Sequence, residues 1–366
     1  MFKEYSEKNH TELSALTIIQ GGGTVKREES DRNLMYDKSN LSNYKMVRKN
    51  DFIVHLRSFE GGLEKSLLDG IISPAYHTFH SDVADSRFYY PYFRSHEFIK
   101  HKLVPHVYGI RDGRSIDIAG MKTIEIPYTS IEEQRKIGDY LESLDHLITL
   151  HQRKCEETKS LKKYMLQKMF PENGKCVPKI RFSGFSDDWE QRKVGNFLTE
   201  SREVGHKGDV AHKMTVKLWS KGICEKNEAG SSNTQYFIRH TGQFIYSKLD
   251  FLNCAFGVVP KNLESFETTA DVPAFDCNEI NPYFMFYTAI QPAFYKKNGI
   301  IADGSRKAKR IHVETFLNMP FFIPNLEEQN KIVDALSSLD HLITLHQHKC
   351  DELQKLKKFM LQNMFV

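Results

Sequence analysis

Apolar residues recur in alternating steps of four and three along two stretches of the chain, residues 131–170 and residues 326–365. That spacing places them along one face of an α-helix. The repeated apolar positions are Ile137, Leu141, Leu144 and Ile148 in the first stretch and Ile332, Leu336, Leu339 and Ile343 in the second. Proline is absent inside both stretches, so each is predicted to form one helix of about 40 residues, roughly 60 Å long.

The two stretches are copies of one another. They agree at 28 of 40 aligned positions, 195 residues apart, and share the unbroken run SLDHLITLHQ. Ser130 with Glu133, and Asn325 with Glu328, have the spacing of a helix cap and its reciprocal acid. A helix this long cannot bury its apolar face in a small domain, so its simplest partner is the other copy. Because a globular region precedes each helix, compact pairing requires the two helices to run antiparallel.

The C-terminal ends of both predicted helices, YMLQKMF and FMLQNMF, are apolar nearly all round. A two-helix pair covers only one face of each helix, so the remaining apolar side chains need other partners. One hypothesis is docking of helices from another subunit, and the other is packing onto the neighbouring globular region of the same chain. The residues concerned are Leu166, Met169, Phe170, Leu361, Met364 and Phe365.

Alternating apolar and polar positions with turn signals predict strands in the two remaining regions. The first contains LTIIQGGGTV, YKMVRKNDFIVHL and DGIISPAYHTF, followed by an amphipathic helix at PYFRSHEFIKHKL. The second repeats this order, with TGQFIYSKL matching KNDFIVHL and PYFMFYTAIQPAFYKK matching the helix. The predicted fold is α+β: two similar globular domains and two long antiparallel helices that form a coiled-coil spacer, related by a pseudo-two-fold internal repeat.

The predicted boundaries are 1–127 for the first globular domain, 128–171 for the first long helix, 172–324 for the second globular domain and 325–366 for the second long helix. A lead-in, VPKIRFSGFSDDWEQRKVGNFL, precedes the second domain and has no counterpart before the first. We expect Phe182 and Trp189 to anchor it by packing.

The composition is that of an ordinary globular protein, with 40% apolar and 27% charged residues among 366. That length allows two domains with their own cores. No apolar run is long enough to cross a bilayer, and Met1 is followed by a polar stretch, so we expect neither a signal peptide nor a membrane span. The six cysteines form no CxxC pair, which favours a reduced, cytoplasmic protein.

The net charge of +4 permits nucleic-acid binding without requiring it, because affinity for phosphates depends on local clusters. Basic clusters at 111–114 and 306–310 fall at matching places in the two globular domains, as a repeated DNA contact would. For each cluster the alternative is a solvated surface. The candidate DNA-contacting residues are Lys26, Arg27, Arg111, Arg114, Lys213, Lys217, Lys221, Asn233, Gln235, Arg306, Lys307, Lys309 and Arg310.

Motifs for catalysis are weak. The sequence Asn281-Pro282-Tyr283 lacks the second proline of a methyltransferase base clamp, and the glycines at 21–23 are not followed by the Gly-Lys-Ser/Thr of a phosphate loop. Zinc is a sharper alternative, because two His-x-x-x-Cys pairs could meet in an antiparallel helix pair. These residues, His151, Cys155, His346 and Cys350, also fit the helix seam as register markers. We therefore expect no metal.

The sequence resembles the specificity subunit of type I restriction-modification systems along essentially its whole length. The resemblance is carried by the duplicated EEQ and LDH motifs, by the lead-in PKIRFSGFSDDWEQRKVG, and by GQFIYSKLDF and DVPAF in the second globular domain. The motif residues are Glu132, Glu133, Gln134, Leu144, Asp145 and His146 in the first copy and Glu327, Glu328, Gln329, Leu339, Asp340 and His341 in the second.

This resemblance implies that each globular domain is a target recognition domain that reads one half of a gapped, two-part site in double-stranded DNA. The paired helices would set the distance between the domains and dock modification subunits. Those partners would carry S-adenosylmethionine and the adenine-methylating site, and ATP-driven restriction subunits would join through them. This chain would itself be non-catalytic and without a cofactor. Family members usually have a lead-in before the first domain as well. The first domain is therefore expected to be abbreviated, to be completed by another polypeptide, or simply to start differently.

A second hypothesis is a protein-binding scaffold, in which the globular domains hold proteins and do not recognise DNA sequence. A third, a self-sufficient methyltransferase, requires the isolated chain to bind S-adenosylmethionine.

Overall fold

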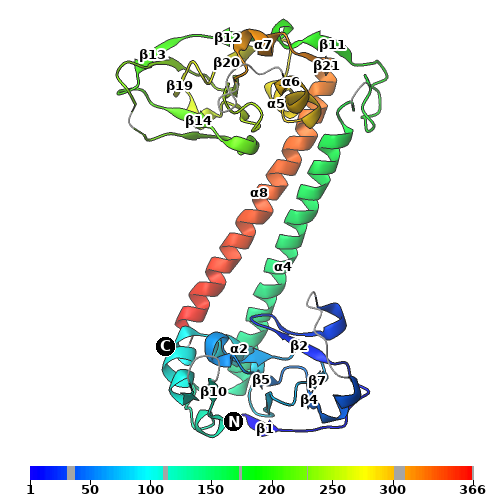
Figure 1. Ribbon diagram of the computed structural model, residues 1–366, viewed down its shortest axis with the longest axis vertical. Helices are drawn as coiled ribbons and strands as arrows, with labels where there is room; N and C mark the ends of the chain where they lie inside the picture. The colour runs from blue at the N-terminus through cyan, green and yellow to red at the C-terminus, as the bar shows by residue number, and fades with distance from the viewer. Residues whose placement is uncertain (31–37, 110–113, 173–174, 229, 301–309, 365–366) are drawn as a thin grey trace. The chain divides into compact units, whose positions relative to one another are not determined.

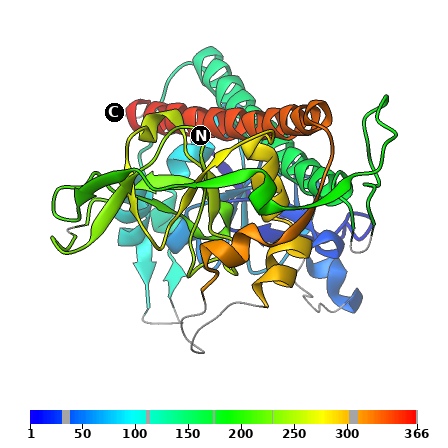
Figure 2. The same ribbon diagram turned by 90° about the horizontal axis from the view of Figure 1, so that it is seen from above.

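The computed structural model describes residues 1–30, 38–109, 114–172, 175–228, 230–300 and 310–364. Contacts group the chain into two units, Met1–Gln152 with Gln347–Val366, and Arg153–His346. Both units mix short strands with helices, in agreement with the predicted α+β class. Colours from blue to cyan mark the globular part of the first unit, and colours from green to orange mark the second unit (Figures 1 and 2).

The first unit is built from short strands followed by helices. Its strands are β1 (Lys3–Tyr5), β2 (Leu16–Ile19), β3 (Gly23–Lys26), β4 (Lys45–Val47), β5 (Phe52–Val54), β6 (Glu64–Lys65), β7 (Gly70–Ile72), β8 (His77–His80), β9 (Val107–Tyr108) and β10 (Ser115–Ile116). Its helices are η1 (Arg27–Glu29), η2 (Lys38–Asn43), α1 (Ser58–Gly61), α2 (Ser86–Phe93), η3 (Glu97–Leu103), η4 (Val104–His106), α3 (Ile118–Met121) and the start of α4 (Ile131–Lys168).

The second unit follows the same order of strands and then helices. Its strands are β11 (Glu190–Lys193), β12 (Leu198–Ser201), β13 (Val204–Lys207), β14 (Met214–Val216), β15 (Ile223–Glu225), β16 (Gln235–Ile238), β17 (Phe244–Tyr246), β18 (Phe256–Val258), β19 (Glu267–Thr269), β20 (Ala274–Cys277) and β21 (Pro320–Ile323). Its helices are η6 (Val194–Asn196), η7 (Leu218–Ser220), η8 (Lys261–Leu263), α5 (Pro282–Ala289), α6 (Pro292–Gly299), α7 (Val313–Leu317) and the start of α8 (Leu326–Asn363).

Each unit contains a four-stranded antiparallel sheet with the same strand order, β1-β8-β5-β6 in the first and β12-β20-β17-β18 in the second. Phe52 lies opposite Phe79 in the first sheet, as Phe244 lies opposite Phe275 in the second. All four phenylalanines are buried in their own cores. The internal repeat is therefore weak in the amino-acid sequence of the globular domains but clear in the order of their strands.

A β-hairpin accompanies each four-stranded sheet, β2-β3 in the first unit and β14-β15 in the second. Immediately before each hairpin one residue forms a parallel bridge, Ala15 with Ile71 and Lys213 with Glu267. These matching bridges identify the two hairpins as equivalent.

The helix after each sheet starts at an equivalent cap. The Asp85 carboxylate accepts a hydrogen bond from the N–H of Arg87, and the Asn281 amide oxygen accepts one from the N–H of Tyr283. A side-chain acceptor at this position satisfies a backbone donor that has no partner within the helix. The sequence Asn281-Pro282-Tyr283 is thus a helix start.

The prediction of one helix at 91–103 is wrong. The cap at Asp85 starts α2 five residues before the predicted range, α2 ends at Phe93, and Glu97–Leu103 forms a separate π-helical segment. In the second unit the predicted helix divides into α5 and α6. Gln291 is extended there (φ −69°, ψ 131°), because a proline disfavours helical geometry in the residue before it.

The two long helices, α4 and α8, have 38 residues each, as the repeated pattern predicts (Figure 1). A buried glutamine fixes the start of each one. The Gln134 side chain accepts from the Asp85 N–H at 3.0 Å and donates to the backbone carbonyl five residues earlier at 2.7 Å. Gln329 makes the same two contacts, with the Asn281 N–H and a carbonyl five residues earlier, both at 3.0 Å. The glutamine of the EEQ motif therefore ties each long helix to the cap of the preceding helix.

The capping residues predicted for the long helices are confirmed, but the reciprocal bonds from the acids are not. The Ser130 hydroxyl accepts from the Glu133 N–H at 3.3 Å, and Asn325 Oδ1 accepts from the Glu328 N–H at 2.9 Å. The Glu133 carboxylate accepts instead from a neighbouring threonine hydroxyl. The Glu328 carboxylate accepts two bonds from Arg181, at 2.7 and 2.8 Å, because the lead-in packs there.

Within the first unit, the C-terminal part of α8 runs antiparallel to the N-terminal part of α4. Lys357 pairs with Asp145, and the Cys350 thiol donates to the Ile148 carbonyl with an Sγ–O distance of 3.7 Å. Leu353 packs with Ile148 in a small apolar cluster.

Within the second unit, the remaining halves of the helices make the equivalent contacts, also antiparallel. Lys162 Nζ lies 2.5 and 2.6 Å from the Asp340 carboxylate oxygens. The Cys155 thiol donates to the Ile343 carbonyl with an Sγ–O distance of 3.9 Å. Each of these residues is the copy, 195 positions away, of one that makes the same contact in the first unit.

Candidate nucleic-acid interface

The basic residues predicted to bind DNA in the first globular domain are partly engaged within the protein. Lys26, at the end of β3, lies 3.5 Å from Glu29 and keeps 45% of its side chain exposed. The Arg27 guanidinium lies 5.5 Å from the centre of the Tyr44 ring, and its Nε donates to the Leu16 carbonyl at 3.3 Å. Lys26 is therefore the better placed of the two for a phosphate.

Arg114 is exposed, with its guanidinium 5.0 Å from the centre of the Phe59 ring. Arg310 lies 3.7 Å from the Asp271 carboxylate. Their neighbours in the predicted basic clusters lie outside the described residues, and these are Arg111, Arg306, Lys307 and Lys309.

Two residues predicted to contact DNA in the second globular domain are committed to the fold instead. Lys213 is 8% exposed, and its Nζ donates to the Glu228 carbonyl at 3.0 Å. The Gln235 amide nitrogen donates to the carbonyls of Gly205 at 2.8 Å and Tyr236 at 2.9 Å, so it bridges β13 and β16. Neither donor is available to a phosphate or a base edge.

The tip of the β14-β15 hairpin is the clearest surface for nucleic acid in the second globular domain. It presents Lys217 and Lys221, both predicted from the sequence and both exposed, on either side of Trp219. Asn233 is exposed as well and offers an amide to base edges. The sequence alone does not predict Trp219 as a contact, because a lone tryptophan in a turn carries no periodic signal; its two flanking lysines are the available clue.

A buried cation in the second unit also went unpredicted. The Arg239 side chain donates to the Thr268 hydroxyl at 2.8 Å and to the backbone carbonyls of Ser201 at 2.7 Å and Val272 at 3.4 Å. Burial lowers the pKa of Arg239 to about 10, so it remains protonated at neutral pH. This arginine holds strands together and does not reach solvent.

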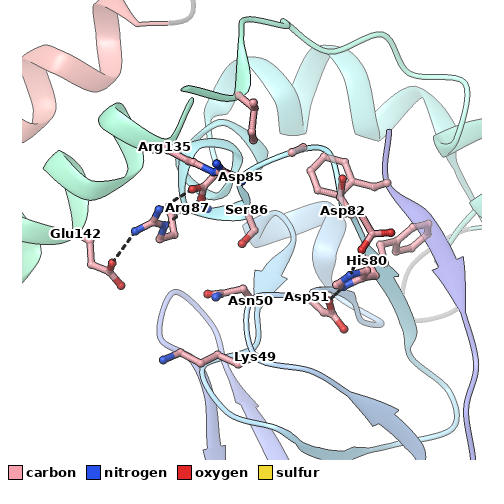
Figure 3. Close-up of a pocket in the computed structure, with 15 residues that line it drawn as sticks. Lys49, Asn50, Asp51, His80, Asp82, Asp85, Ser86, Arg87, Arg135 and Glu142 are labelled. Carbon is pink, nitrogen blue, oxygen red and sulfur yellow. Dashed lines mark hydrogen bonds and ion pairs between the residues drawn. The ribbon is translucent and has the colours of Figure 1, made fainter. Parts of the chain in front are cut away.

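A polar cavity of about 510 Å³ lies in the first unit between the four-stranded sheet and the start of α4 (Figure 3). Arg87 there pairs with Asp85 at 2.6 Å and with Glu142 at 3.3 Å. His80 pairs with Asp51, and that hydrogen bond raises the pKa of His80. Four carboxylates line the cavity together with Lys49, Arg87 and Arg135, so it is a poor phosphate site.

A second cavity in the first unit, of about 570 Å³, adjoins the β2-β3 hairpin. Gln20 and Arg57 line it and are exposed. Both can donate hydrogen bonds to base edges or phosphates. The sequence alone predicts neither residue as a contact, since the segments that bring them together are distant in the chain.

The apolar residues at the end of α4 correct the docking prediction. Met169 and Phe170 are 1% and 5% exposed in the core of the second unit, with Phe170 beside Trp189 and Phe284. Leu166 packs against the same core. These three residues therefore pack onto the neighbouring globular region of the same chain, which is the second of the two hypotheses. Trp189 and Phe182 anchor the lead-in there as predicted.

At the end of α8, Leu361 is half-buried and Met364 packs against the core of the first unit, while Phe365 lies outside the described residues. Several large apolar side chains stay exposed along both helices. Those nearest the C-terminal ends are Leu161 and Tyr164 of α4 and their copies Leu356 and Phe359 of α8.

The two helix cysteines that could have joined a zinc site donate to backbone carbonyls. Among the described residues, no three side chains of His, Cys, Asp or Glu gather as they would around a metal ion. Nor does any helix in the described part of the chain combine the length and apolarity of a membrane span.

The chain is similar to specificity subunits of type I restriction enzymes. Residues 187–355 match the family described as "Type I restriction modification DNA specificity domain". The chain is 23% identical over 266 residues to the type I restriction enzyme MjaVIII specificity subunit of Methanocaldococcus jannaschii, covering 66% of this chain and 61% of that protein. It is 22% identical over 254 residues to the putative MjaX specificity subunit of the same organism, covering 67% and 59%. The chain thus spans about three fifths of the length of these curated relatives.

The solved structure of a type I restriction-modification S subunit from M. genitalium shares the fold. Its TM-score is 0.57 at 13% identity, covering 100% of this chain and 96% of that one. Specificity subunits of type I systems are non-catalytic and recognise DNA. The matched residues include the end of the lead-in, the second four-stranded sheet and most of α8. The chain is accordingly similar to type I restriction-modification specificity subunits, and its residues 187–355 match their DNA specificity domain.

Proposed function

We propose that this chain is a non-catalytic subunit whose two globular domains each read one half of a gapped, bipartite site in double-stranded DNA. The observation that carries this is one backbone plan presented with two different surfaces. Both units have the same four-stranded sheet and the same hairpin, but the hairpin tips differ, with QGG at 20–22 and KLWSKG at 217–222. Two copies of one reader with different contacts fit a site with two unlike halves.

Contacts to phosphates would hold each domain on the duplex, and contacts to base edges would select the sequence. In the second unit Lys217 and Lys221 can neutralise phosphates while Asn233 reaches a base. In the first unit Lys26 can serve the phosphates, with Gln20 and Arg57 near the bases. Pockets with paired carboxylates, such as the one in Figure 3, stay outside the interface.

The long helices would act as the spacer between the two readers. A straight helix of 38 residues is about 57 Å long. Half-sites read from one face of the duplex lie about 34 Å apart or a multiple of that. The repeated ion pair and thiol contacts in the two units support a fixed register between the helices.

The same helices would dock modification subunits, which supply S-adenosylmethionine and the methyltransferase site. ATP-dependent restriction subunits would join the complex through them. The docking surface proposed here is the exposed pair Leu161 and Tyr164 and the copied pair Leu356 and Phe359, which are 40–64% exposed. One equivalent pair in each unit fits two copies of the same partner.

Methylome sequencing of cells that carry this chain with a modification subunit tests the function directly. We expect one gapped motif with two specific parts. Exchange of residues 178–324 for those of a relative should change one part and leave the other. An ungapped motif, or a change in both parts after the exchange, would contradict the proposal.

The docking surface has its own test. Leu161→Glu combined with Leu356→Glu should abolish co-purification with the modification subunit, because a charge would be buried in an apolar contact. Gln354→Glu places a charge at an exposed polar position of α8 and is the matched control. If Gln354→Glu reduced co-purification equally, Leu161 and Leu356 would not form the docking surface.

A further inference from the structure

The tip of the β14-β15 hairpin holds a tryptophan in an unfavourable backbone conformation. Trp219 has φ +59° and ψ +36°, in the left-handed region, and Ser220 follows with φ +53°. Residues with a side chain rarely adopt this region, and such outliers concentrate at functional sites. At the equivalent hairpin tip of the first unit, the positive φ angles belong to Gly21 and Gly23.

Backbone hydrogen bonds to the neighbouring loop fix this conformation. The Trp219 N–H donates to the Asn253 carbonyl at 2.8 Å, and the Ser220 N–H donates to the Cys254 carbonyl at 2.9 Å. The Lys217 N–H closes the turn on the Gly222 carbonyl at 2.9 Å. The tip is therefore a rigid platform made by backbone bonds.

The indole stands on this platform and faces solvent. Trp219 is 59% exposed and the preceding Leu218 is 41% exposed, whereas the other tryptophan of the chain, Trp189, is 2% exposed. Burial of a large aromatic surface stabilises a protein, so this fold forgoes that stabilisation at a strained position. Such an arrangement suits a side chain whose partner arrives from outside.

The charges around the indole identify the kind of partner. Lys217 and Lys221 are exposed on its two sides, and the tip segment 217–222, KLWSKG, contains no acid. Phosphates flank every base step of DNA, and aromatic or apolar side chains in DNA-binding proteins insert between bases or stack on them. A lysine-flanked tryptophan matches that pattern better than the polar rim of a protein interface.

We propose that Trp219 is a specificity-determining residue that inserts its indole at a base step in the half-site read by the second globular domain, with Lys217 and Lys221 on the adjacent phosphates. This rests on the proposed function and adds to it a residue and a mode of reading. Recognition would then depend on how easily the step unstacks, as pyrimidine–purine steps do. The first domain, with glycines at its tip, would read its half-site without a wedge.

The experiment uses the complex of the full chain with its modification subunits and a duplex that carries the methylated motif, with a scrambled duplex of equal composition as reference. Trp219→Ala should weaken binding of the motif duplex by between about five-fold and 150-fold, the range of base–aromatic stacking. Trp219→Phe should stay within a few fold of the wild type. Lys217→Ala with Lys221→Ala should weaken both duplexes and lower the salt dependence by about two phosphate contacts.

Trp219→Gly separates folding from binding. Glycine adopts positive φ without strain, so this variant should unfold at the same temperature as the wild type or higher, while losing affinity as Trp219→Ala does. In the wild-type complex, 2-aminopurine placed along the motif should brighten at one or two adjacent positions in one half-site, and Trp219→Ala should remove that signal. Acrylamide quenching of tryptophan emission should fall on binding, because Trp219 is the exposed one of two tryptophans.

The outcomes separate the two ideas. If the wild type prefers the motif duplex and Trp219→Ala binds it equally well, the inserted tryptophan is refuted and DNA recognition stands. If the wild type does not distinguish the two duplexes, both are refuted. If Trp219→Ala prevents assembly with the modification subunits while other properties hold, the residue is a protein contact and the inference is wrong.

Discussion

The two globular domains share a backbone plan but differ in the residues that this plan places at equivalent points. Strand β5 of the first sheet begins directly after Asp51, and the equivalent strand β17 of the second sheet begins directly after Gln243. Asp51 pairs with His80, and Gln243 donates to Asp276 at 2.8 Å, between the same two strand positions. One location thus holds a titratable acid–imidazole pair in one domain and an amide–acid pair in the other.

The common positions are those that set the relation of a domain to its long helix. Gln134 and Gln329 make the same pair of hydrogen bonds, and the helix copies make the same ion pairs. The divergent positions lie in the sheets and hairpins. The fold therefore separates residues that assemble the molecule from residues free to change what each domain recognises.

The lead-in is the largest difference between the domains. In the second unit β11 pairs with β21, and Trp189 fills the core beside Phe284. In the first unit, residues 122–130 precede α4 as β21 precedes α8, and they form no strand. Trp189→Ala should therefore lower the free energy of unfolding of the second unit by about 3–5 kcal/mol, from lost burial and the cavity left behind.

Native-state hydrogen exchange, followed by peptide in each unit, measures that loss. Protection in the first unit should stay unchanged. Trp219→Ala is the matched control, because that tryptophan is exposed and its removal should leave both units as stable as before. An equal loss of protection in the two units would mean that they unfold as one, and the distinction drawn here would fail.

The buried glutamines Gln134 and Gln329 test a feature that the two domains share. Gln134→Leu and Gln329→Leu each leave a partly buried backbone N–H without its acceptor, which costs about 2 kcal/mol. We expect the two losses to match within about 1 kcal/mol, each confined to its own unit, by the same exchange measurement. Glu132→Gln and Glu327→Gln alter the exposed neighbours in the motif and should have little effect. A neutral Gln329→Leu would refute the structural role of the motif.

The helix seam offers a smaller asymmetry. Leu353 is 7% exposed beside Leu144 and Ile148 in the first unit, and its copy in the second unit is Thr158. Leu353→Thr should cost about 1–2 kcal/mol, because it removes apolar contacts and brings a hydroxyl into the seam. Thr158→Leu should stabilise the second unit by roughly half as much. Amide exchange in the two helices decides this, and a destabilising Thr158→Leu would show that the seam there is not equivalent.

The sequence predicted the long helices, their capping residues, the α+β class and several strands of the first domain, because these features follow from periodicity and local capping chemistry. It misjudged features that depend on which distant segments meet. Met169 and Phe170 look like a docking patch until the lead-in covers them, and Lys213 and Gln235 look free until β16 and its neighbours surround them. Trp219 needed the opposite correction, since only the folded hairpin shows it to be strained and exposed.

The smallest predicted effect uses the acid–imidazole pair. The hydrogen bond with Asp51 raises the pKa of His80 above its ordinary value of 6.5. The folded state therefore holds this proton more tightly than the unfolded state, so the stabilisation is complete below about pH 6.5 and is lost as pH rises through the raised pKa. His80 is 37% exposed, so solvent screening keeps the contribution below about 1 kcal/mol.

Between pH 6 and pH 8 the first unit should lose this stability, and His80→Gln should remove that pH dependence. The amide of Gln243 has no proton to lose in this range, so the second unit should show no such loss from the equivalent position. If hydrogen exchange showed the same pH slope in wild type and His80→Gln, the pair at this position would not distinguish the domains.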